Sequence, residues 1–215
     1  MSDRLVIVAR YKENLDWVNK LQHDFIIYNK GNDWPYEFKR DDVENQGREP
    51  ETYLRAIIEN YEKLNNYNFM AFLQGNPFDH CSDVLEIIDE YNDLEKYSFL
   101  SNTFGKCDFE KIYYYGNTST NMIDTLLKGN YDDVPGIMKT LYLINFFGIS
   151  LSSCSWGYSC GAQYIVPTTM ILKKSKKWWI RVYEIYRIYN QYQNHDPSHM
   201  MEFLWPVLWI HQETE

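Results

Sequence analysis

The chain alternates short apolar runs with segments of helical periodicity. Residues 4–9 contain an uninterrupted β-branched run and predict a fully buried strand. Residues 13–22 carry apolar side chains near helical spacing and predict a helix, and residues 23–31 predict a second strand that ends at a glycine. The order strand, helix, strand is typical of an α/β layered domain.

The best-defined helix follows a charged loop over residues 32–46. Apolar side chains recur on one face from residue 53 to residue 64, and Glu51 with Arg55 has the spacing of a supporting ion pair. A residue that precedes proline disfavours the α conformation, whereas proline itself suits the first helical position. The sequence therefore predicts a helix capped by Glu49 with Pro50 as its first residue.

The rest of the chain continues this alternation, with one glycine-rich loop before the last strand. Pro206 is expected to kink or end the final helix, which has Asp196 as cap and Pro197 at its first position. Together the elements predict one α/β domain over residues 1–215 with a mainly parallel sheet. The further predicted elements are strands at 69–75 and 96–102, helices at 82–91, 121–129, 134–149, 173–192 and 196–210, and a loop from 155 that enters a strand ending at 167.

Composition narrows the function classes. A formal net charge of -9 argues against a surface that coats nucleic acid, because phosphate neutralisation requires clustered Lys and Arg. No apolar stretch approaches the roughly 20 residues of a membrane span, and the apolar run at the N-terminus is too short for a signal peptide. We therefore expect a cytoplasmic protein without a transmembrane segment. Its 19 Tyr and 7 Trp fit either a surface that grips sugars, bases or proteins, or a codon-biased core.

The cysteines lack the CxxC spacing of zinc and redox motifs, so we expect free thiols. A zinc site is a remote alternative, and the two histidines that it would use are separated by an Asp-Pro helix start. The cysteines are Cys81, Cys107, Cys154 and Cys160, and the zinc alternative would use the last two with His195 and His199.

Polar side chains follow the first and third predicted strands directly. In open α/β sheets ligands bind outside the carboxyl ends of the strands, so these residues are expected to line one rim. The start of the helix near Arg48 is expected at the same rim, where helix N–H groups and a guanidinium attract phosphate. The rim residues are Arg10, Tyr11, Lys12, Gln74, Asn76, Asp79 and His80.

Each candidate also has a structural reading. Asp79 can hold a divalent cation or cap the next helix. Arg48 can bind phosphate or lie solvated in a loop. Glu202, among apolar neighbours, can act as a general base or face solvent. Trp156 and the glycines beside it can contact a ligand or form a tight turn.

One basic and aromatic cluster, KKSKKWWIR at residues 173–181, opens the predicted helix 173–192. It can touch a membrane surface or an anionic acceptor, and it can equally be a solvated helix start.

Several motifs together resemble an uncharacterised domain family of fungi, phages and large viruses. They are NQGREPETYL from residue 45, FLQGNPFDH from residue 72, WGYSCGAQYIV from residue 156 and EFLWP from residue 202. That family is in turn similar to glycosyltransferases of the GT-A type, including a chlorella-virus glycosyltransferase domain. VIVARYKENLDWV at the start also looks like the GT-A opening strand and loop.

The resemblance implies a GT-A-like glycosyltransferase that moves a sugar from a nucleotide diphosphate sugar, with uridine as the expected base, to an acceptor hydroxyl. It implies Mn²⁺ or Mg²⁺ at Asp79, which falls where such enzymes place the last acid of their DxD motif, although Pro77 and Phe78 replace the other acid. It implies Glu202 as catalytic base, with Asp79 or Asp196 as alternatives. The residues expected to bind the donor are Ala9, Arg10, Tyr11, Lys12, Gly47, Arg48, Gln74, Trp156 and Gly157.

Two other function classes remain open at this point. A carbohydrate-binding or interaction protein on the same fold would suit the incomplete acidic motif and the many aromatic residues. A metal-dependent phosphoester hydrolase would use the same carboxylate without an acceptor.

Overall fold

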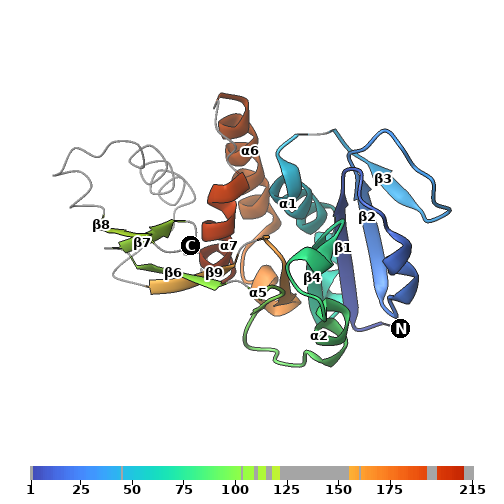
Figure 1. Cartoon of the computed structure of the whole chain (residues 1–215), viewed down its shortest axis with the longest axis horizontal. Helices are drawn as coiled ribbons and strands as arrows, with labels where there is room; N and C mark the ends of the chain where they lie inside the picture. Colours follow the sequence, from blue (N-terminus) through green and yellow to red (C-terminus); the bar gives the residue numbers. More distant parts are fainter. Residues whose placement is uncertain are drawn as a thin grey trace.

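A six-stranded mixed sheet forms the centre of the structure (Figure 1). The computed structural model describes residues 2–44, 46–102, 104–108, 111–114, 118–121, 155–159, 161–192 and 198–210. Across the sheet the strands are β3 (Arg40–Asp42), β2 (Asp24–Asn29), β1 (Arg4–Arg10), β4 (Phe69–Gln74), β10 (Tyr164–Pro167) and β5 (Ser98–Phe99). The first four are parallel, and β10 is antiparallel to both of its neighbours. The prediction of an α/β fold with a mainly parallel sheet is confirmed.

Both faces of this sheet are covered, which explains why β1 is buried along its whole length. Successive side chains of a strand point to opposite faces. Leu5 and Ile7 pack into the core under the larger helices, whereas Val6 and Val8 pack on the other side. The first face is covered by α1 (Arg48–Asn60), α5 (Thr168–Leu172), α6 (Lys176–Tyr192) and α7 (Ser198–Ile210), and the second by the 3-10 helix η1 (Asp16–Lys20) and by α2 (Val84–Glu90).

A second, antiparallel sheet lies beyond α7 (Figure 1). Its strands in order are β8 (Thr118–Asn121), β7 (Lys111–Tyr114), β6 (Phe104–Asp108) and β9 (Ser155–Ser159), and β9 lies against α7. The predicted glycine-rich loop at 155–159 is therefore wrong, because this segment pairs with β6. The predicted helices at 121–129 and 134–149 lie outside the described residues, apart from Asn121, which ends β8. That the whole chain forms one domain stays a prediction.

The helix predicted at residues 13–22 is reduced to one 3-10 turn, η1. Side-chain hydrogen bonds compete with helix formation at its start, because Asn14 Oδ1 accepts from the Asp16 N–H at 2.7 Å and Tyr36 Oη accepts from the Leu15 N–H at 2.8 Å. The strand predicted at 96–102 is likewise short, since only β5 pairs with β10.

Helix α1 begins earlier than predicted. Gly47 is the N-cap with φ 63°, Arg48 also has a positive φ of 46°, and Pro50 is the third helical residue. Proline is tolerated there because the first N–H groups of a helix have no partner inside it. The prediction of Glu49 as cap is therefore wrong. At its other end α1 continues into the 3-10 helix η2 (Tyr61–Asn66).

The C-terminal helices also begin and end at other residues than predicted. Residues 168–172 form the separate helix α5, and α6 begins at Lys176 instead of residue 173. Helix α7 passes through Pro206 and ends at Ile210, so the proline does not end it. Asp196 and Pro197 lie outside the described residues. Within the part of the chain that is described, no helix is both long and apolar enough to cross a membrane.

Cys81 is the cysteine whose side chain is described. It is buried and forms no disulfide, and its thiol donates to Asp83 Oδ1 at 3.3 Å, beside the start of α2. Burial, helped by the Asp83 carboxylate, raises the pKa of this thiol to about 11. Cys81 is thus a protonated, packed thiol, as predicted.

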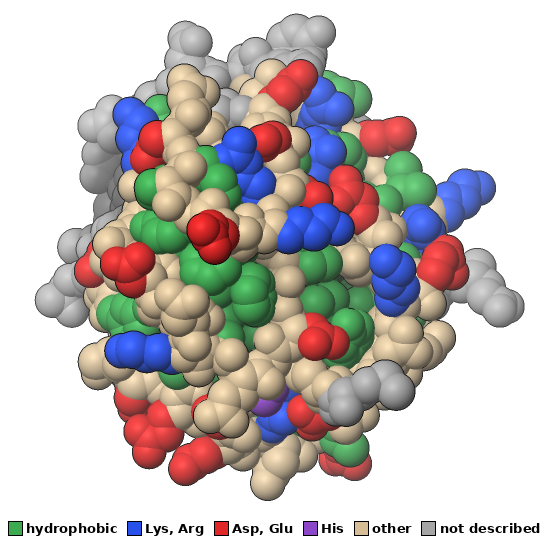
Figure 2. Space-filling model, turned by 90° about the vertical axis from the view of Figure 1, so that its right-hand side faces the viewer, with side chains coloured by type: hydrophobic (Ala, Val, Ile, Leu, Met, Phe, Trp, Pro, Cys, Tyr) green, Lys and Arg blue, Asp and Glu red, His purple; other side chains and the backbone are tan. Residues whose placement is uncertain are grey.

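An aromatic cluster covers the β3 side of the sheet. Figure 2 views the molecule from this side and shows hydrophobic side chains gathered in the middle of the face, with charged side chains around them. Tyr36 stacks on Phe38 with ring centroids 5.6 Å apart, and the Arg40 guanidinium lies 4.8 Å from the Trp34 ring. The loop that precedes β3 is therefore packed onto the sheet.

Lys174 is a fully buried lysine between α5 and α7. Its ammonium nitrogen donates to the Met170 carbonyl at 3.1 Å and to the Trp209 carbonyl at 2.9 Å. Burial, with a smaller contribution from Lys173, lowers the pKa of Lys174 to about 7. The folded chain therefore releases this proton far more readily than an unfolded chain, in which lysine keeps its ordinary value of 10.5.

This buried lysine predicts a pH dependence of stability. Between the folded pKa of about 7 and the ordinary value of 10.5 the unfolded chain binds more protons, so the free energy of unfolding should rise with pH across this range, by up to about 1.4 kcal/mol per pH unit. Lys174→Met should flatten this rise in urea unfolding curves. The exposed neighbour variant Lys173→Met should keep it, and an unchanged slope in Lys174→Met would contradict the assignment.

Candidate functional site

The tips of the parallel strands bring several predicted residues to one edge. Arg10 at the end of β1 is in register with Asn29 at the end of β2, and Ala9 is in register with Gln74 at the end of β4. The start of α1 reaches the same edge through Lys30, which follows β2. The edge at the strand tips is therefore the candidate site, as the sequence predicts.

Arg10 is a buried cation at this edge, with 2% of its surface exposed. Its guanidinium donates to Asn29 Oδ1 and to the Asp33 carbonyl, both at 2.7 Å, and to the Glu13 carbonyl at 3.0 Å. It also pairs with the Asp33 carboxylate at 3.0 Å, and this hydrogen bond lowers the pKa of Asp33. These contacts join the loop after β1 to the loop after β2. These hydrogen bonds show that Arg10 holds the two loops together. Direct contact of Arg10 with a nucleotide stays a prediction.

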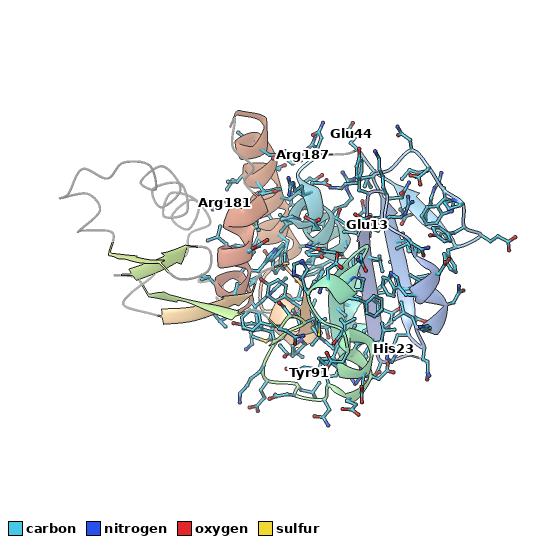
Figure 3. All side chains as sticks on the ribbon, viewed as in Figure 1. Glu13, His23, Glu44, Tyr91, Arg181 and Arg187 are labelled. Carbon is cyan, nitrogen blue, oxygen red and sulfur yellow. The ribbon has the colours of Figure 1, made fainter. Side chains whose placement is uncertain are left out.

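The loop after β1 exposes Tyr11 and Lys12. Both side chains face solvent, and the Lys12 ammonium lies 4.9 Å from the Tyr11 ring centroid. Their backbone N–H groups donate to one Glu13 carboxylate oxygen at 2.7 and 3.0 Å. Glu13, labelled in Figure 3, packs flat on Gly75 after β4, where an added Cβ would lie 2.5 Å from that oxygen. Glycine at position 75 thus lets the loops after β1 and β4 meet.

The start of α1 is held by a buried ammonium group. Lys30 Nζ donates to the carbonyls of Gln46 and Arg48, both at 2.5 Å, and contacts a Glu51 carboxylate oxygen at 3.0 Å. The Tyr186 hydroxyl donates to the Gly47 carbonyl at 2.9 Å. Three successive carbonyls are therefore directed toward α1 and Lys30.

The direction of these carbonyls fixes the direction of the next N–H groups. In a planar trans peptide the N–H of one residue points opposite to the carbonyl of the residue before it, and no cis bond occurs among the described residues. The N–H groups of Gly47, Arg48 and Glu49 consequently point away from the body of α1. They lie at the positive end of the helix dipole, beside the exposed Arg48 side chain. This geometry suits an anion.

Glu51 keeps the buried ammonium neutralised. Burial acts to raise the pKa of Glu51, but Lys30, Tyr183 and Arg55 outweigh it and the pKa falls below its ordinary value. Its other oxygen accepts from Arg55 and from the Tyr183 hydroxyl, each at 2.8 Å. The predicted Glu51–Arg55 pair is confirmed. Its carboxylate is nevertheless buried, and Glu59 pairs with Arg55 at 3.5 Å.

Amide side chains connect the tip of β4 to the segment before β10. Gln74 Nε2 donates to the Gly161 carbonyl at 2.7 Å. The fully buried Gln163 accepts from the Gln74 N–H at 3.3 Å and donates to the carbonyls of Pro77 and Leu100. Gln74 therefore links the tip of β4 to the segment before β10. Its contact with a nucleotide-sugar donor stays a prediction.

Asp79 and His80 follow β4 in the 3-10 turn η3 (Pro77–Asp79). Asp79 is exposed, whereas the His80 ring packs against Gly161, where φ is 89° and an added Cβ would lie 2.5 Å from the ring. No group of three or more His, Cys, Asp and Glu side chains is arranged for a metal ion within the described ranges. Asp79 thus offers one free-standing carboxylate, which fits Mg²⁺ or Mn²⁺ only if phosphate oxygens and water complete the coordination.

Glu202 lies on α7, across the core from α1. It is half-buried, and its neighbours Met201, Leu204 and Trp205 are fully buried. Its backbone carbonyl accepts from the Tyr164 hydroxyl at 3.3 Å. Its side chain is thus partly covered, and its role as a base stays a prediction.

The Tyr53 hydroxyl of α1 lies in the core. It is fully buried and has no hydrogen-bond partner among the described residues. Burial first, then the charges of Glu49, Tyr164 and Glu202, raise the pKa of Tyr53. The sequence predicted Tyr53 only as a core residue, and it gave no sign of a buried hydroxyl without a hydrogen-bond partner among the described residues.

Trp156 and Gly157 lie in the second sheet, in register with Cys107 and Lys106 of β6. Their backbone is a strand and not a turn. The Trp156 side chain lies outside what the structure describes, so its contact with a sugar stays a prediction. The alternative zinc site also lies outside, because it rests on Cys154, Cys160 and the side chains of His195 and His199.

Comparison with known proteins gives one result. The profile of a family described as "Protein of unknown function (DUF3431)" matches residues 5–215, so the chain belongs to this family. No curated protein and no solved structure matches the chain significantly.

The buried ion pair under the α1 start predicts a large effect of one substitution. Glu51→Gln should lower the free energy of unfolding by about 3–5 kcal/mol, because it leaves the Lys30 ammonium buried without a counter-charge. The additional change Lys30→Met should recover part of that loss. Urea unfolding measures both effects.

The exposed pair Lys176–Glu62, at 3.4 Å, provides the control. Glu62→Gln should cost at most about 1 kcal/mol. Equal losses in Glu51→Gln and Glu62→Gln would show that the Lys30–Glu51 pair does not hold this helix start.

Proposed function

We propose that this DUF3431 protein is a glycosyltransferase on a GT-A-like fold, transferring a sugar from a nucleotide diphosphate sugar to an acceptor hydroxyl. The observation that carries the proposal is the meeting of three strand tips and the start of α1 at one edge of a mainly parallel sheet. Ligands of open α/β sheets bind at this edge. The GRE and QGNPFDH motifs resemble an uncharacterised family that is in turn similar to GT-A enzymes, and this resemblance supports a nucleotide-sugar ligand.

The donor would lie across the edge at the strand tips. Tyr11 and Lys12 present an exposed ring and an ammonium group to the nucleotide. The outward N–H groups at the start of α1 and the Arg48 side chain would hold the diphosphate. Arg10 and Lys30 would act from inside, by fixing the loops that carry these groups.

Asp79 would hold a divalent cation together with the diphosphate. Mg²⁺ is often bound by one or two carboxylates plus phosphate oxygens, which fits a single exposed acid. When bound, the ion would neutralise the negative charge on the departing nucleoside diphosphate. UDP-sugars with Mn²⁺ or Mg²⁺ are the first donors to test.

Glu202 would deprotonate the acceptor hydroxyl. Glu202 is half-buried on a helix whose adjacent residues Met201 and Leu204 are fully buried, and partial burial of a carboxylate suits a general base near neutral pH. In the proposed reaction the acceptor oxygen forms a bond to the anomeric carbon of the sugar while the bond from that carbon to the diphosphate breaks. The proton of the acceptor hydroxyl passes to Glu202. Trp156 is proposed to stack on the sugar.

A second candidate is a non-catalytic carbohydrate-binding or interaction protein on the same fold. The lone carboxylate at position 79, without a further acid beside it in the motif, favours this alternative. Ligand panels separate the two functions. Stabilisation by nucleotide diphosphates favours the transferase, whereas a response to free glycans alone favours the binding protein.

The metal assignment predicts a specific loss in Asp79→Asn. The melting temperature of the unaltered chain should rise with a UDP-sugar and rise further with Mn²⁺, and Asp79→Asn should lose the Mn²⁺ increment. Asp24→Asn, an exposed acid at the opposite end of β2, is the matched control. An Mn²⁺ increment that survives in Asp79→Asn would remove Asp79 from the metal site.

The base assignment predicts that Glu202→Gln binds the donor normally but transfers the sugar about 10²–10⁴-fold more slowly. Donor binding by calorimetry and transfer to an acceptor glycan measure the two effects separately. Glu90→Gln on the exposed face of α2 is the control. Full transfer activity in Glu202→Gln would place the base elsewhere.

A further inference from the structure

We infer that two tyrosine hydroxyls of α6, those of Tyr183 and Tyr186, position the anion-binding start of α1. The inference rests on the proposed function, in which the donor diphosphate binds the N–H groups of residues 47–49. Helix α6 packs along α1 (Figure 1), and the two hydroxyls bond to its first turn. Both tyrosines would act through this backbone segment, without contact to the donor.

The backbone at the start of α1 has to be held in place by its surroundings. Gly47 has φ 63° and Arg48 has φ 46°, so both lie in the left-handed region. This conformation is unfavourable for arginine, and it persists only where surrounding contacts fix it. A left-handed residue next to a helical one arranges successive N–H groups into a concave site for an anion. The contacts that fix this conformation therefore also set the affinity for an anion.

Tyr186 holds the middle one of three successive carbonyls. Its hydroxyl donates to the Gly47 carbonyl at 2.9 Å. The carbonyls on either side, at Gln46 and Arg48, accept from Lys30. The Tyr186 ring also lies against Gly47, where an added Cβ would be 3.0 Å from the ring atom Cε1. The ring thus covers the glycine, and the hydroxyl fixes the peptide whose N–H belongs to Arg48.

Tyr183 acts one step further away. Its hydroxyl donates to one Glu51 carboxylate oxygen at 2.8 Å, and the other oxygen pairs with Lys30 at 3.0 Å. Burial, helped by Glu51, raises the pKa of Tyr183, so its hydroxyl stays protonated and remains a donor. The bond from Tyr183 also helps to lower the pKa of Glu51, which keeps the carboxylate charged beside Lys30. Tyr183 therefore supports the same carbonyls through two intervening side chains.

The two tyrosines tie a late part of the chain to an early one. Tyr186 is 139 positions from Gly47, and Tyr183 is 132 positions from Glu51. Residues three apart share one face of a helix, so both bonds fix the same face of α6 against the first turn of α1. The anion site is therefore shaped by α6 as well as by the strand tips.

Titration with inorganic pyrophosphate, followed by NMR, tests the inference. Metal is left out so that the Asp79 assignment does not enter, and the amide signals of residues 47–49 should shift in the unaltered chain. Tyr186→Phe keeps the ring against Gly47 and removes only the hydroxyl. It should raise the Kd of pyrophosphate about tenfold, because a hydrogen bond that holds an unfavourable backbone conformation is lost. Tyr183→Phe should raise the Kd by a smaller factor.

Tyr61→Phe is the matched control. The Tyr61 hydroxyl donates to the Lys174 carbonyl at 2.6 Å, at the other end of α1. This variant should lower the free energy of unfolding in urea as Tyr186→Phe does, yet bind pyrophosphate as the unaltered chain does. All affinities are measured where every variant is fully folded, so a merely structural role of Tyr186 would leave its Kd unchanged.

The outcomes separate the inference from the proposed function. Equal pyrophosphate affinity in the unaltered chain and in Tyr186→Phe would overturn the inference and leave the proposed function intact. Equal losses of affinity in Tyr186→Phe and Tyr61→Phe would overturn the inference as well, because the effect would then come from general loosening. If the signals of residues 47–49 do not shift in the unaltered chain, the diphosphate assignment of the proposed function is wrong and the inference falls with it.

Discussion

The buried ammonium group of Lys30 is the constraint on which the candidate site depends. A lysine amine beneath a helix start is unfavourable unless its charge is neutralised and its N–H groups are bonded. Glu51 supplies the charge, and the carbonyls of Gln46 and Arg48 supply the acceptors. Satisfying Lys30 turns these carbonyls toward α1 and Lys30, and the same peptide planes then direct the next N–H groups away from the body of the helix. One buried cation thus organises a surface that can receive an anion.

Arg10 plays the corresponding part on the neighbouring strand. Its donors are taken up by the Glu13 carbonyl, Asn29 and Asp33, so the loops after β1 and β2 are tied to a single guanidinium. Two of the cations at this edge, Arg10 and Lys30, are therefore buried and hold loops in place. The side chains of Tyr11, Lys12, Arg48 and Asp79 are exposed.

Sequence periodicity predicted the central sheet and the long helices, because burial on two faces leaves a clear pattern in β1 and α1. It also predicted that the strand tips would meet. The sequence did not predict the structural roles of Lys30, Glu51 and Glu13, because a charged residue in a loop or on a helix is expected to face solvent until its partners are known. It misplaced the start of α1 because tertiary contacts, and not the proline rule, fix the positive φ angles of Gly47 and Arg48.

The unmatched hydroxyl of Tyr53 has a consequence for how this core should be regarded. Together with the indole nitrogens of Trp205 and Trp209, it places polar atoms in the buried core without hydrogen-bond partners among the described residues. Each such atom lowers the free energy of unfolding by about 1–3 kcal/mol relative to an apolar ring of the same shape. The core beside α7 is therefore not optimised for stability, and a more stable version of the protein could be engineered there without changing its surface.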